Sequence, residues 1–273
     1  MPSYVVTGSS RGIGLQFVRQ LSANTDNIVF GVVRNLGGAS ELKKLETDRA
    51  NVHVLQADVT DYQALKAAAD QVAQLTGGTL EYLINNAAYQ QTERKYYTID
   101  TYAEKGEIEE LKKDMLDNFN ANTIGVIHSI DAFLPLLKAA SAKATVKIIS
   151  LSSGIGDLDL TLESRLDLGP AYCISKAALN MVVAKYATRF ADDNMVFVAL
   201  SPGLVNTATG PPTPEDIEQY QAFGKSLKAA YPDWDGQALT PEASVRLQLG
   251  VIEKVERKDT GAFISHWGNK QWV

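Results

Sequence analysis

A glycine-rich turn lies near the start of the chain: Thr7-Gly8-Ser9-Ser10-Arg11-Gly12-Ile13-Gly14. It follows a short β-branched run and precedes residues 12–23, whose apolar side chains recur at helical spacing. In such a unit, Gly8 permits the tight turn, Gly12 lets a pyrophosphate approach the backbone, and Gly14 lets helix and strand pack closely. The helix N-terminus offers unpaired N–H groups and the positive end of its dipole. The turn therefore predicts a dinucleotide site, against the alternative of a glycine-rich turn that binds nothing.

Strands and helices alternate from this unit to the end of the chain. Apolar runs predict further strands at residues 27–33, 52–55, 80–84, 146–149, 195–200 and 261–264. Helical spacing predicts helices around residues 41–45, at 61–75 after a Thr60 cap, and at 116–140, 172–190 and 215–230. This alternation favours a doubly wound α/β fold, with about seven parallel strands and helices on both faces, as one domain over residues 1–273.

Three segments are less regular than the rest: residues 89–113, 157–169 and 206–234. Ligands of a parallel sheet bind beyond the carboxyl ends of its strands, and long loops there are often functional. We therefore expect these segments, with Tyr89 and Gln90 among them, to surround the substrate.

The composition is that of a soluble globular protein, with 273 residues, 45% of them hydrophobic, and a formal net charge of −6. Such a chain has no basic surface for a nucleic acid or an anionic membrane. The single cysteine, Cys173, excludes an intramolecular disulfide, and the histidines (His53, His128 and His266) lack metal-ligand spacing, so we expect no metal. No apolar run approaches the roughly 20 residues of a membrane helix. A core strand that begins near Ser3 leaves no room for a signal peptide, so we predict a cytoplasmic protein.

The residues after the second predicted strand indicate the type of dinucleotide. An NAD site carries a carboxylate there for the ribose 2′-hydroxyl, whereas this chain has Val33-Arg34-Asn35. Arg34 follows Gly14 by 20 residues, and Arg11 lies inside the turn. Two guanidiniums suit a 2′-phosphate, which accepts forked, charge-assisted hydrogen bonds. A lone arginine after a strand is usually just solvated, but the pair and the missing acid predict NADPH over NADH.

A tyrosine and a lysine lie one helical turn apart in Tyr172-Cys173-Ile174-Ser175-Lys176. An ammonium within about 4–6 Å stabilises a phenolate and lowers the tyrosine pKa from about 10, which makes the hydroxyl a usable acid and base near pH 7. The pair alone is common on ordinary helices. Its position after a strand that ends Ser150-Leu151-Ser152-Ser153 favours a catalytic role, because those hydroxyls reach the ligand edge of the sheet. Cys173 is interpreted as a packed neighbour.

In this order and spacing the motifs resemble those of the short-chain dehydrogenases/reductases over almost the whole chain. They are the turn at residues 7–14, Asn85-Asn86-Ala87-Ala88, Asn122, Ser153, Tyr172 with Lys176, and Pro202-Gly203-Leu204-Val205-Asn206-Thr207. Within the family, Leu134-Pro135-Leu136-Leu137-Lys138 and the ending Gly261-Ala262-Phe263-Ile264-Ser265 are similar to the Sniffer-type NADPH carbonyl reductases. The resemblance implies a Rossmann-type fold and an NADP(H)-dependent oxidoreductase with a small-molecule carbonyl substrate.

The resemblance also implies a role for each matching residue. The catalytic set is Ser153 for the substrate carbonyl, Tyr172 for the proton, Lys176 for the nicotinamide ribose and the Tyr172 pKa, and Asn122 for a relay water. Ser152 and Asn120 are the nearest alternatives, and Thr123-Ile124-Gly125 favours Asn122 over Asn120. The cofactor set is Gly8, Ser10, Arg11, Gly12, Ile13, Gly14, Arg34, Asn35, Asp58, Val59, Asn86, Ala87, Tyr172, Lys176, Pro202, Gly203, Val205 and Thr207.

The chain departs from the family pattern around the expected substrate. Ser153 and Tyr172 are 19 residues apart, more than in the family, residues 89–113 are also longer, and Ala88 replaces a glycine. Residues 215–230 carry one apolar face, formed by Ile217, Tyr220, Phe223 and Leu227. That face either packs on the domain or belongs to a lid that closes over the nicotinamide. Because these walls have aromatics and few charges, we expect bulky apolar or aromatic carbonyls rather than small charged keto acids.

Together these features predict the NADPH-dependent reduction of a ketone or aldehyde to an alcohol. Two alternatives stay open: a non-redox catalyst or dinucleotide-sensing regulatory protein on the same fold, and NADP-dependent alcohol oxidation as the physiological direction. Residues 116–140 and 172–190 match the helices through which relatives form dimers or tetramers, so we expect a homodimer or a homotetramer.

Overall fold

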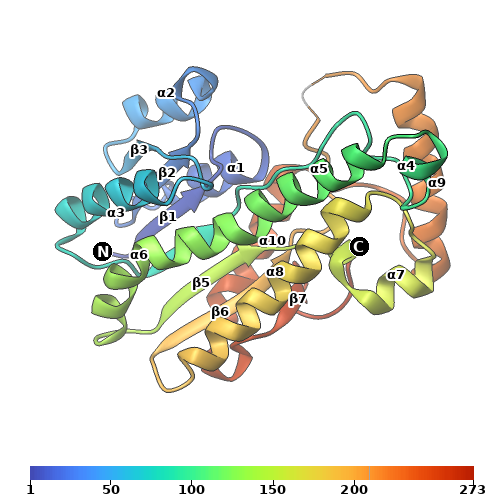
Figure 1. Cartoon of the computed structure of the whole chain (residues 1–273). Helices are drawn as coiled ribbons and strands as arrows, with labels where there is room; N and C mark the ends of the chain where they lie inside the picture. Colours follow the sequence, from blue (N-terminus) through green and yellow to red (C-terminus); the bar gives the residue numbers. More distant parts are fainter. Residues whose placement is uncertain (209) are drawn as a thin grey trace.

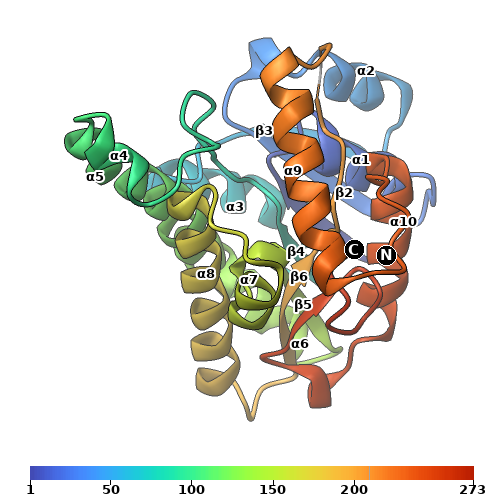
Figure 2. The same cartoon turned by 90° about the vertical axis from the view of Figure 1, so that its right-hand side faces the viewer.

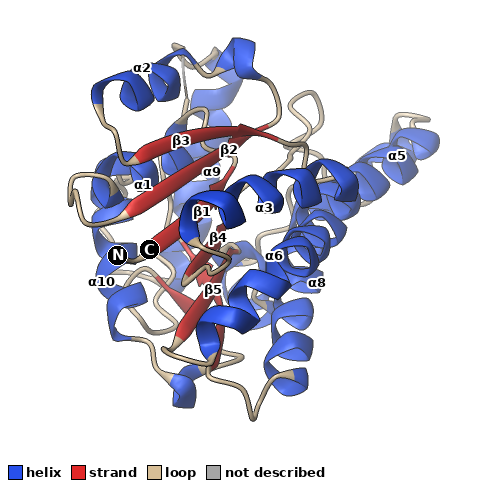
Figure 3. Cartoon of the chain, turned by 90° about the vertical axis from the view of Figure 1, so that its left-hand side faces the viewer, coloured by secondary structure: helices blue, strands red, loops and turns tan. Residues whose placement is uncertain are grey.

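A parallel sheet forms the centre of the protein (Figure 1, Figure 3). The computed structural model describes residues 1–208 and 210–273. The strands are β1 (Ser3–Thr7), β2 (Ile28–Val33), β3 (Val52–Gln56), β4 (Tyr82–Asn85), β5 (Val146–Leu151), β6 (Met195–Ser201) and β7 (Phe263–Ser265). They pair in the order β3-β2-β1-β4-β5-β6-β7, and every pair is parallel. The predicted doubly wound α/β fold is confirmed.

Helices cover both faces of this sheet (Figure 3). They are α1 (Gly12–Leu21), α2 (Ser40–Asp48), α3 (Tyr62–Thr76), α4 (Thr101–Glu104), α5 (Ile108–Phe119), α6 (Gly125–Ser141), α7 (Leu158–Ser164), α8 (Pro170–Arg189), α9 (Pro214–Ala230) and α10 (Pro241–Lys254). Because the chain turns from β3 back past β1 to β4, the strand order reverses between β1 and β4. A crevice for a ligand is expected beyond the carboxyl ends of the strands at such a reversal.

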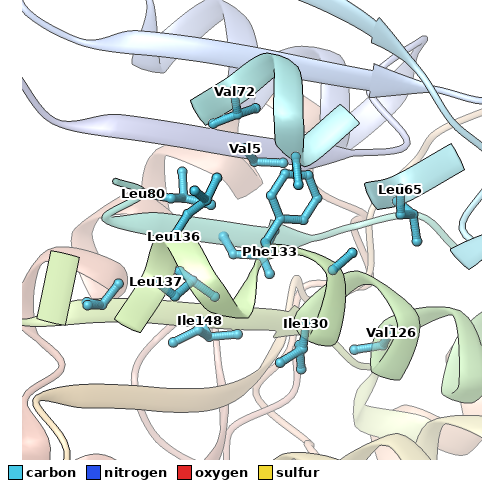
Figure 4. Packing of buried hydrophobic residues seen from close by; sticks show 14 of the residues in the cluster. Val5, Leu65, Val72, Leu80, Val126, Ile130, Phe133, Leu136, Leu137 and Ile148 are labelled. Carbon is cyan, nitrogen blue, oxygen red and sulfur yellow. The ribbon is translucent and has the colours of Figure 1, made fainter. Parts of the chain in front are cut away.

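Successive strand residues point to opposite faces of the sheet, so each face has its own core. Val5 and Ile148 pack with α3, α6 and α8, whereas Val6 and Ile149 pack with α1, α2 and α10. Figure 4 shows the first of these cores, in which Phe133 of α6 lies among apolar side chains from the sheet and from α3. Strands with apolar residues on both faces explain why the sequence has continuous rather than alternating apolar runs.

The long helix before β5 begins earlier than residue 116, the predicted start. Ile108–Ser141 is continuous, because a π-helical turn at Asn120–Ile124 joins α5 to α6. By length and composition this segment could cross a membrane, because its most apolar 18-residue window has a mean hydropathy of 1.3, which corrects the expectation that no such segment exists. Of its most apolar window, 56% is buried, and α6 packs that apolar side on the sheet (Figure 4).

Two of the segments expected to be irregular contain helices. Residues 157–169 contain α7 (Leu158–Ser164), which Asp157 caps by accepting a hydrogen bond from the Leu160 N–H at 3.0 Å. Residues 89–113 contain α4 and the first turns of α5. At α3 the cap is Asp61 rather than Thr60, because the Asp61 carboxylate accepts the free N–H groups of the first turn.

The third irregular segment contains the predicted helix α9, which begins one residue before the predicted start. Its capping box joins Thr213 and Asp216. α9 packs against α7, so these two helices lie side by side near the carboxyl edge of the sheet (Figure 2).

Candidate active site

The glycine turn is fastened to the end of β4. The Asn86 side-chain amide donates to the carbonyl oxygens of Thr7 at 2.8 Å and Gly8 at 3.0 Å. Gly8 has a φ of +69°, and a Cβ on it would lie 2.7 Å from the Cα of Ala87. A Cβ on Gly14 would lie 2.3 Å from the Gly8 oxygen. Gly8 and Gly14 therefore have the tight-turn and close-packing roles that the sequence predicts, and Asn86 and Ala87 hold the turn.

Gly12, unlike Gly8 and Gly14, has open space where a side chain would lie. Its φ is +56°, and a Cβ on it would meet only Thr207, at 3.6 Å, within 4 Å. α1 starts at this residue, and its preceding residue, Arg11, makes no side-chain cap. The first N–H groups of α1 thus remain available beside open space, which fits a pyrophosphate. Thr207, which lies on the far side of this space, also belongs to the predicted cofactor set.

The two predicted phosphate-binding arginines lie at the ends of neighbouring strands. β1 and β2 pair in the register Thr7 with Val32, so Arg11 and Arg34 follow adjacent strand ends. Both side chains are exposed, and neither forms an ion pair within residues 1–208 and 210–273. Asn35 instead uses its side-chain oxygen to accept from the Gly37 N–H at 2.8 Å. These positions fit a site for a 2′-phosphate.

Asp58 and Val59 of the predicted cofactor set lie after β3. The Asp58 carboxylate accepts from the Thr60 N–H at 2.9 Å and from its hydroxyl at 2.7 Å, which shapes the turn into α3. Val59 packs on Gly125 at the start of α6, where a Cβ would lie 3.0 Å from a Val59 methyl. The structure thus places both residues at the carboxyl edge of the sheet, in the same row as the glycine turn.

Tyr172 and Lys176 stand on the first turns of α8, beside the end of β5. Gly169, with a φ of +63°, and Pro170 at the first helical position start this helix just before them. Lys176 is 2% exposed, its Nζ donates to the carbonyl oxygen of Leu151 at 2.7 Å, and it lies 5.5 Å from the centroid of the Tyr172 ring. The structure therefore brings the predicted pair together at the ligand edge.

Burial controls the protonation of this pair. It lowers the pKa of Lys176 to about 7 and raises the pKa of Tyr172 above its usual value. The expected lowering of the Tyr172 pKa by Lys176 is not seen in this structure, because burial raises the Tyr172 pKa and also disfavours the charged form of Lys176. Burial also raises the pKa of the Cys173 thiol to about 11, which agrees with a packed neighbour rather than a nucleophile.

The two candidate serines differ in what their hydroxyls contact. Ser152 is 3% exposed, and its Oγ donates to Asn180 Oδ1 at 2.6 Å. Ser153 is only partly buried, and its hydroxyl has no hydrogen-bond partner in the part of the chain that the structure describes. Ser153 therefore has the free hydroxyl that polarising a carbonyl requires, as preferred from the sequence.

Asn122 is buried in the π-helical turn, whereas Asn120 is exposed. The Asn122 side chain accepts from the Tyr89 N–H at 2.7 Å and donates to the Tyr89 oxygen at 2.8 Å and to Ser175 Oγ at 2.9 Å. These bonds fix Tyr89 beside α8. The geometry agrees with Asn122 rather than Asn120 as the inward-facing residue, and its part in holding a water stays a prediction.

The loop that follows β6 continues the row of site residues. Gly203 has a φ of +82°, and a Cβ on it would lie 2.6 Å from the ring of His266. Ser244 Oγ donates to the Pro202 oxygen at 2.7 Å, and Val205 pairs with Leu239. His266 is 2% exposed, and burial lowers its pKa to about 4. Among the described residues, no group of three or more His, Cys, Asp or Glu side chains could hold a metal.

A cavity of about 630 Å³ lies behind this loop. Its walls include Leu204, Tyr231, Trp234, His266, Trp267 and Gln271. None of the four predicted catalytic residues lines it. Trp234 and Trp267 thus form part of the wall of this cavity.

The predicted apolar face of α9 is divided. Phe223 and Leu227 pack in an apolar cluster with Leu160 of α7 and with Trp272. Ile217, which is 48% exposed, and Tyr220, which is 42% exposed, face solvent. The C-terminal half of α9 thus packs on the domain, which is one of the two expectations for this face, whereas the N-terminal half does not.

Sequence reasoning missed the polar contacts that tie residues 89–98 to α9. The Asp216 carboxylate accepts from Lys95 Nζ at 2.6 Å and from the Tyr96 hydroxyl at 2.7 Å. The Gly169 N–H donates to the Tyr97 oxygen at 2.9 Å. Arg94 ties the same segment to α5, because its side chain pairs with the buried Asp114 at 2.7 Å. These contacts enclose the start of α8, where Tyr172 stands.

Comparison with known proteins identifies relatives over the full length. The family described as short chain dehydrogenase matches residues 3–218. Short chain dehydrogenase virK of Hypocrea virens is 40% identical over 277 residues, and short-chain dehydrogenase/reductase AacuF of Aspergillus aculeatus is 41% identical over 275 residues; each match covers 100% of both chains. The NADPH-bound carbonyl reductase from chicken fatty liver is 32% identical, with a TM-score of 0.80 and 98% coverage of both chains. The carbonyl reductase Sniffer of D. melanogaster shares the fold, with a TM-score of 0.79, 24% identity and 98% coverage of both chains.

Proposed function

The chain belongs to the short-chain dehydrogenases, and from that premise we propose that it is an NADPH-dependent reductase that converts a ketone or aldehyde to an alcohol. It is an oxidoreductase of the short-chain dehydrogenase and carbonyl reductase type. One observation carries the proposal: a free Ser153 hydroxyl follows β5, where the buried Lys176 Nζ lies 5.5 Å from the Tyr172 ring.

The residues at the carboxyl edge fit a dinucleotide. The N–H groups at the start of α1 and the open side of Gly12 would hold the pyrophosphate. Arg11 and Arg34 are exposed, and the end of β2, Val33-Arg34-Asn35, carries no carboxylate, so the two arginines would hold the 2′-phosphate. Val205 and Thr207 would hold the carboxamide. When bound, the cofactor supplies the hydride.

The chain's own residues would then complete the reduction. Ser153 would donate a hydrogen bond to the substrate carbonyl oxygen and stabilise the negative charge that develops on it. Tyr172, kept protonated by the burial that raises its pKa, would give its hydroxyl proton to that oxygen. Lys176 would bind the ribose hydroxyls, and Asn122 would keep Tyr89 in place next to α8.

An apolar cluster between α7 and α9 supports a bulky apolar or aromatic carbonyl as the substrate. Leu160, Leu166, Phe223 and Trp234 belong to one apolar cluster between α7 and α9. The charged groups on the segment from residue 94 to 98 are already paired: Arg94 with Asp114 and Lys95 with Asp216. Because Arg94, Lys95, Asp114 and Asp216 are paired with one another, they offer no free charge to a small charged keto acid. An aromatic ring would instead gain from burial against the apolar cluster.

The same residues also catalyse the reverse reaction, so NADP-dependent alcohol oxidation remains the second candidate for the physiological direction. We also propose a cytoplasmic homodimer. Apolar side chains on the outer faces of α5 and α8 support the dimer: Leu116 and Met181 are 59% and 63% exposed, and closed two-fold association buries such faces. Sedimentation of the free chain at the mass of a single chain would contradict it.

The test is the oxidation of NADPH in the presence of carbonyls of graded size, with NADH alongside. We expect turnover with large aromatic ketones, a preference for NADPH, and better kcat/KM than with small charged keto acids. Tyr172→Phe should abolish turnover while it leaves the NADPH Kd within about threefold, because only the proton donor is lost. Undiminished turnover by that variant would contradict the mechanism, and a dinucleotide that binds without any turnover would favour the sensing alternative.

A further inference from the structure

Trp272 contacts the turn that carries Ser153. Gly154 follows Ser153, and a Cβ built on Gly154 would lie 2.7 Å from the Cβ of Trp272 and 2.9 Å from its Cγ. Gly154 is not among the residues with positive φ, so its backbone does not require glycine. The close approach of Trp272 requires it, because any side chain at this position would displace either the tryptophan or the turn.

Several contacts hold Trp272 in place. It is 4% exposed, and its ring stacks on Phe263 of β7 with centroids 4.4 Å apart. Its backbone N–H donates to the Tyr231 hydroxyl at 3.4 Å, and that hydroxyl donates to the Lys270 oxygen at 3.3 Å. Trp272 is therefore anchored to the sheet on one side, through Phe263, and to the end of α9 on the other, through Tyr231.

The turn after Ser153 has two further supports, one from the end of β6 and one from α8. The Gly154 N–H donates to Ser201 Oγ at the end of β6, at 3.0 Å. At Gly156, a Cβ would lie 3.0 Å from the Cβ of Lys176. Trp272 supplies the third contact of this turn, and it comes from the segment that follows β7.

We propose that Trp272 is a positioning residue, which holds the Ser153 hydroxyl where it meets the substrate carbonyl. The inference rests on the proposed function. With the indole removed, space opens next to Gly154, and the Ser153 turn can shift into it. A shift of about 1 Å in a group that must meet a reacting atom can lower the rate about 100-fold. The glycine turn that would hold the dinucleotide makes no contact with Trp272 in the contacts above, so cofactor affinity should be spared.

The experiment compares Trp272→Ala with the unmodified chain, using an aromatic ketone from the graded series. We expect kcat to fall by about 10- to 100-fold and the NADPH Kd to stay within about twofold. Trp272→Phe should recover most of kcat, because a ring remains against Phe263 and Gly154. Trp267→Ala is the matched control: this tryptophan lies in the same segment, is 50% exposed and packs on His266, so its removal should leave kcat within about threefold.

A double-mutant cycle shows whether Trp272 acts through Ser153. In a Ser153→Ala background, Trp272→Ala should change kcat by less than about twofold, since no hydroxyl remains to position. If Trp272→Ala unfolds the chain, Trp272→Leu serves in the same cycle, because it keeps an apolar side chain but not the flat contact.

An equal loss of kcat in the Ser153→Ala background, or an equal loss in Trp267→Ala, would overturn the proposal. Unchanged kcat in Trp272→Ala would do so too, while the proposed function would stand. Absence of turnover by the unmodified chain on every carbonyl would overturn the proposed function, and this inference with it.

Discussion

Cofactor selectivity offers the most direct test of how the strand ends are used. Arg11 and Arg34 are exposed and follow the adjacent strands β1 and β2. If both bind a 2′-phosphate, replacing them with alanine should weaken NADPH and leave NADH unchanged, because NADH lacks that phosphate.

The size of the effect follows from their exposure. Hydrogen bonds to charged groups contribute about 1.5–3 kcal/mol, and groups open to solvent lie at the lower end of that range. About 1.5 kcal/mol corresponds to roughly tenfold in Kd. Arg11→Ala and Arg34→Ala should therefore each raise the NADPH Kd about tenfold, and the double variant about 100-fold. The loss should be smaller at high ionic strength, since salt screens exposed charges.

Titration of the reduced cofactor's fluorescence, at low and at high salt, measures these constants. Arg19→Ala is the matched control, because Arg19 lies on α1, the helix that Arg11 precedes, and its side chain is 37% exposed and pairs with Glu41 at 2.8 Å. Its NADPH Kd should not change by more than about twofold. A double variant whose NADPH Kd rises less than threefold, or whose NADH Kd rises equally, would refute the assignment of the two arginines.

Three further predictions concern stability and the substrate wall. The pKa of His266 is about 4 in the folded chain against 6.5 ordinarily, so between pH 6.5 and pH 4 the unfolded chain binds more protons than the folded chain. Stability should therefore fall by about 3 kcal/mol as the pH drops through this range. His266→Asn should flatten that part of a profile of urea midpoint against pH, and an unaltered acid slope would contradict this. Asp216→Asn breaks the ion pair with Lys95 and should raise the KM for large ketones several-fold with little loss of stability, because solvent-exposed ion pairs contribute little to stability. An unchanged KM in steady-state assays would count against a link between α9 and residues 94–98 at the substrate site. Gly14→Ala should lower the free energy of unfolding by about 2–4 kcal/mol through overpacking, whereas Gly12→Ala should lower it by about 1 kcal/mol and mainly weaken NADPH binding. Chemical denaturation and cofactor titration compare the two variants. Equal losses of stability would contradict the difference in the surroundings of the two glycines.

The parts of the fold that depend on local patterns are predictable from the sequence. α9 shows this, because its start depends on Thr213 and Asp216, which form a capping box within the segment itself. α5 shows the opposite case. The residues that it buries are Asp114 and Asn118, which are polar, so its inward face has no apolar signal. Their partners, such as Arg94 at 2.7 Å from Asp114, come from another segment.

The chemistry of the site is predictable to the same extent. Tyr172 and Lys176 lie on one helix, so their spacing alone places them together. The direction of the Tyr172 pKa shift is not predictable in this way, because it depends on how deeply the whole fold buries the pair. The spacing in the sequence predicts how far apart Tyr172 and Lys176 lie, whereas their burial determines how strongly the charged form of each is disfavoured.

The walls of the site arise from contacts between residues that are far apart in the chain, and this determines which properties the sequence can reveal. Lys95 and Asp216 are separated by 121 positions, and Trp272 reaches Gly154 across a similar distance in the sequence. No periodicity or spacing rule connects such residues. The proposed reacting centre, by contrast, is built from local motifs at the ends of β1, β4, β5 and β6. Reaction type can therefore be predicted from short segments of this chain, whereas substrate size and the exact placement of Ser153 depend on the contacts made by residues 94–98, α9 and Trp272.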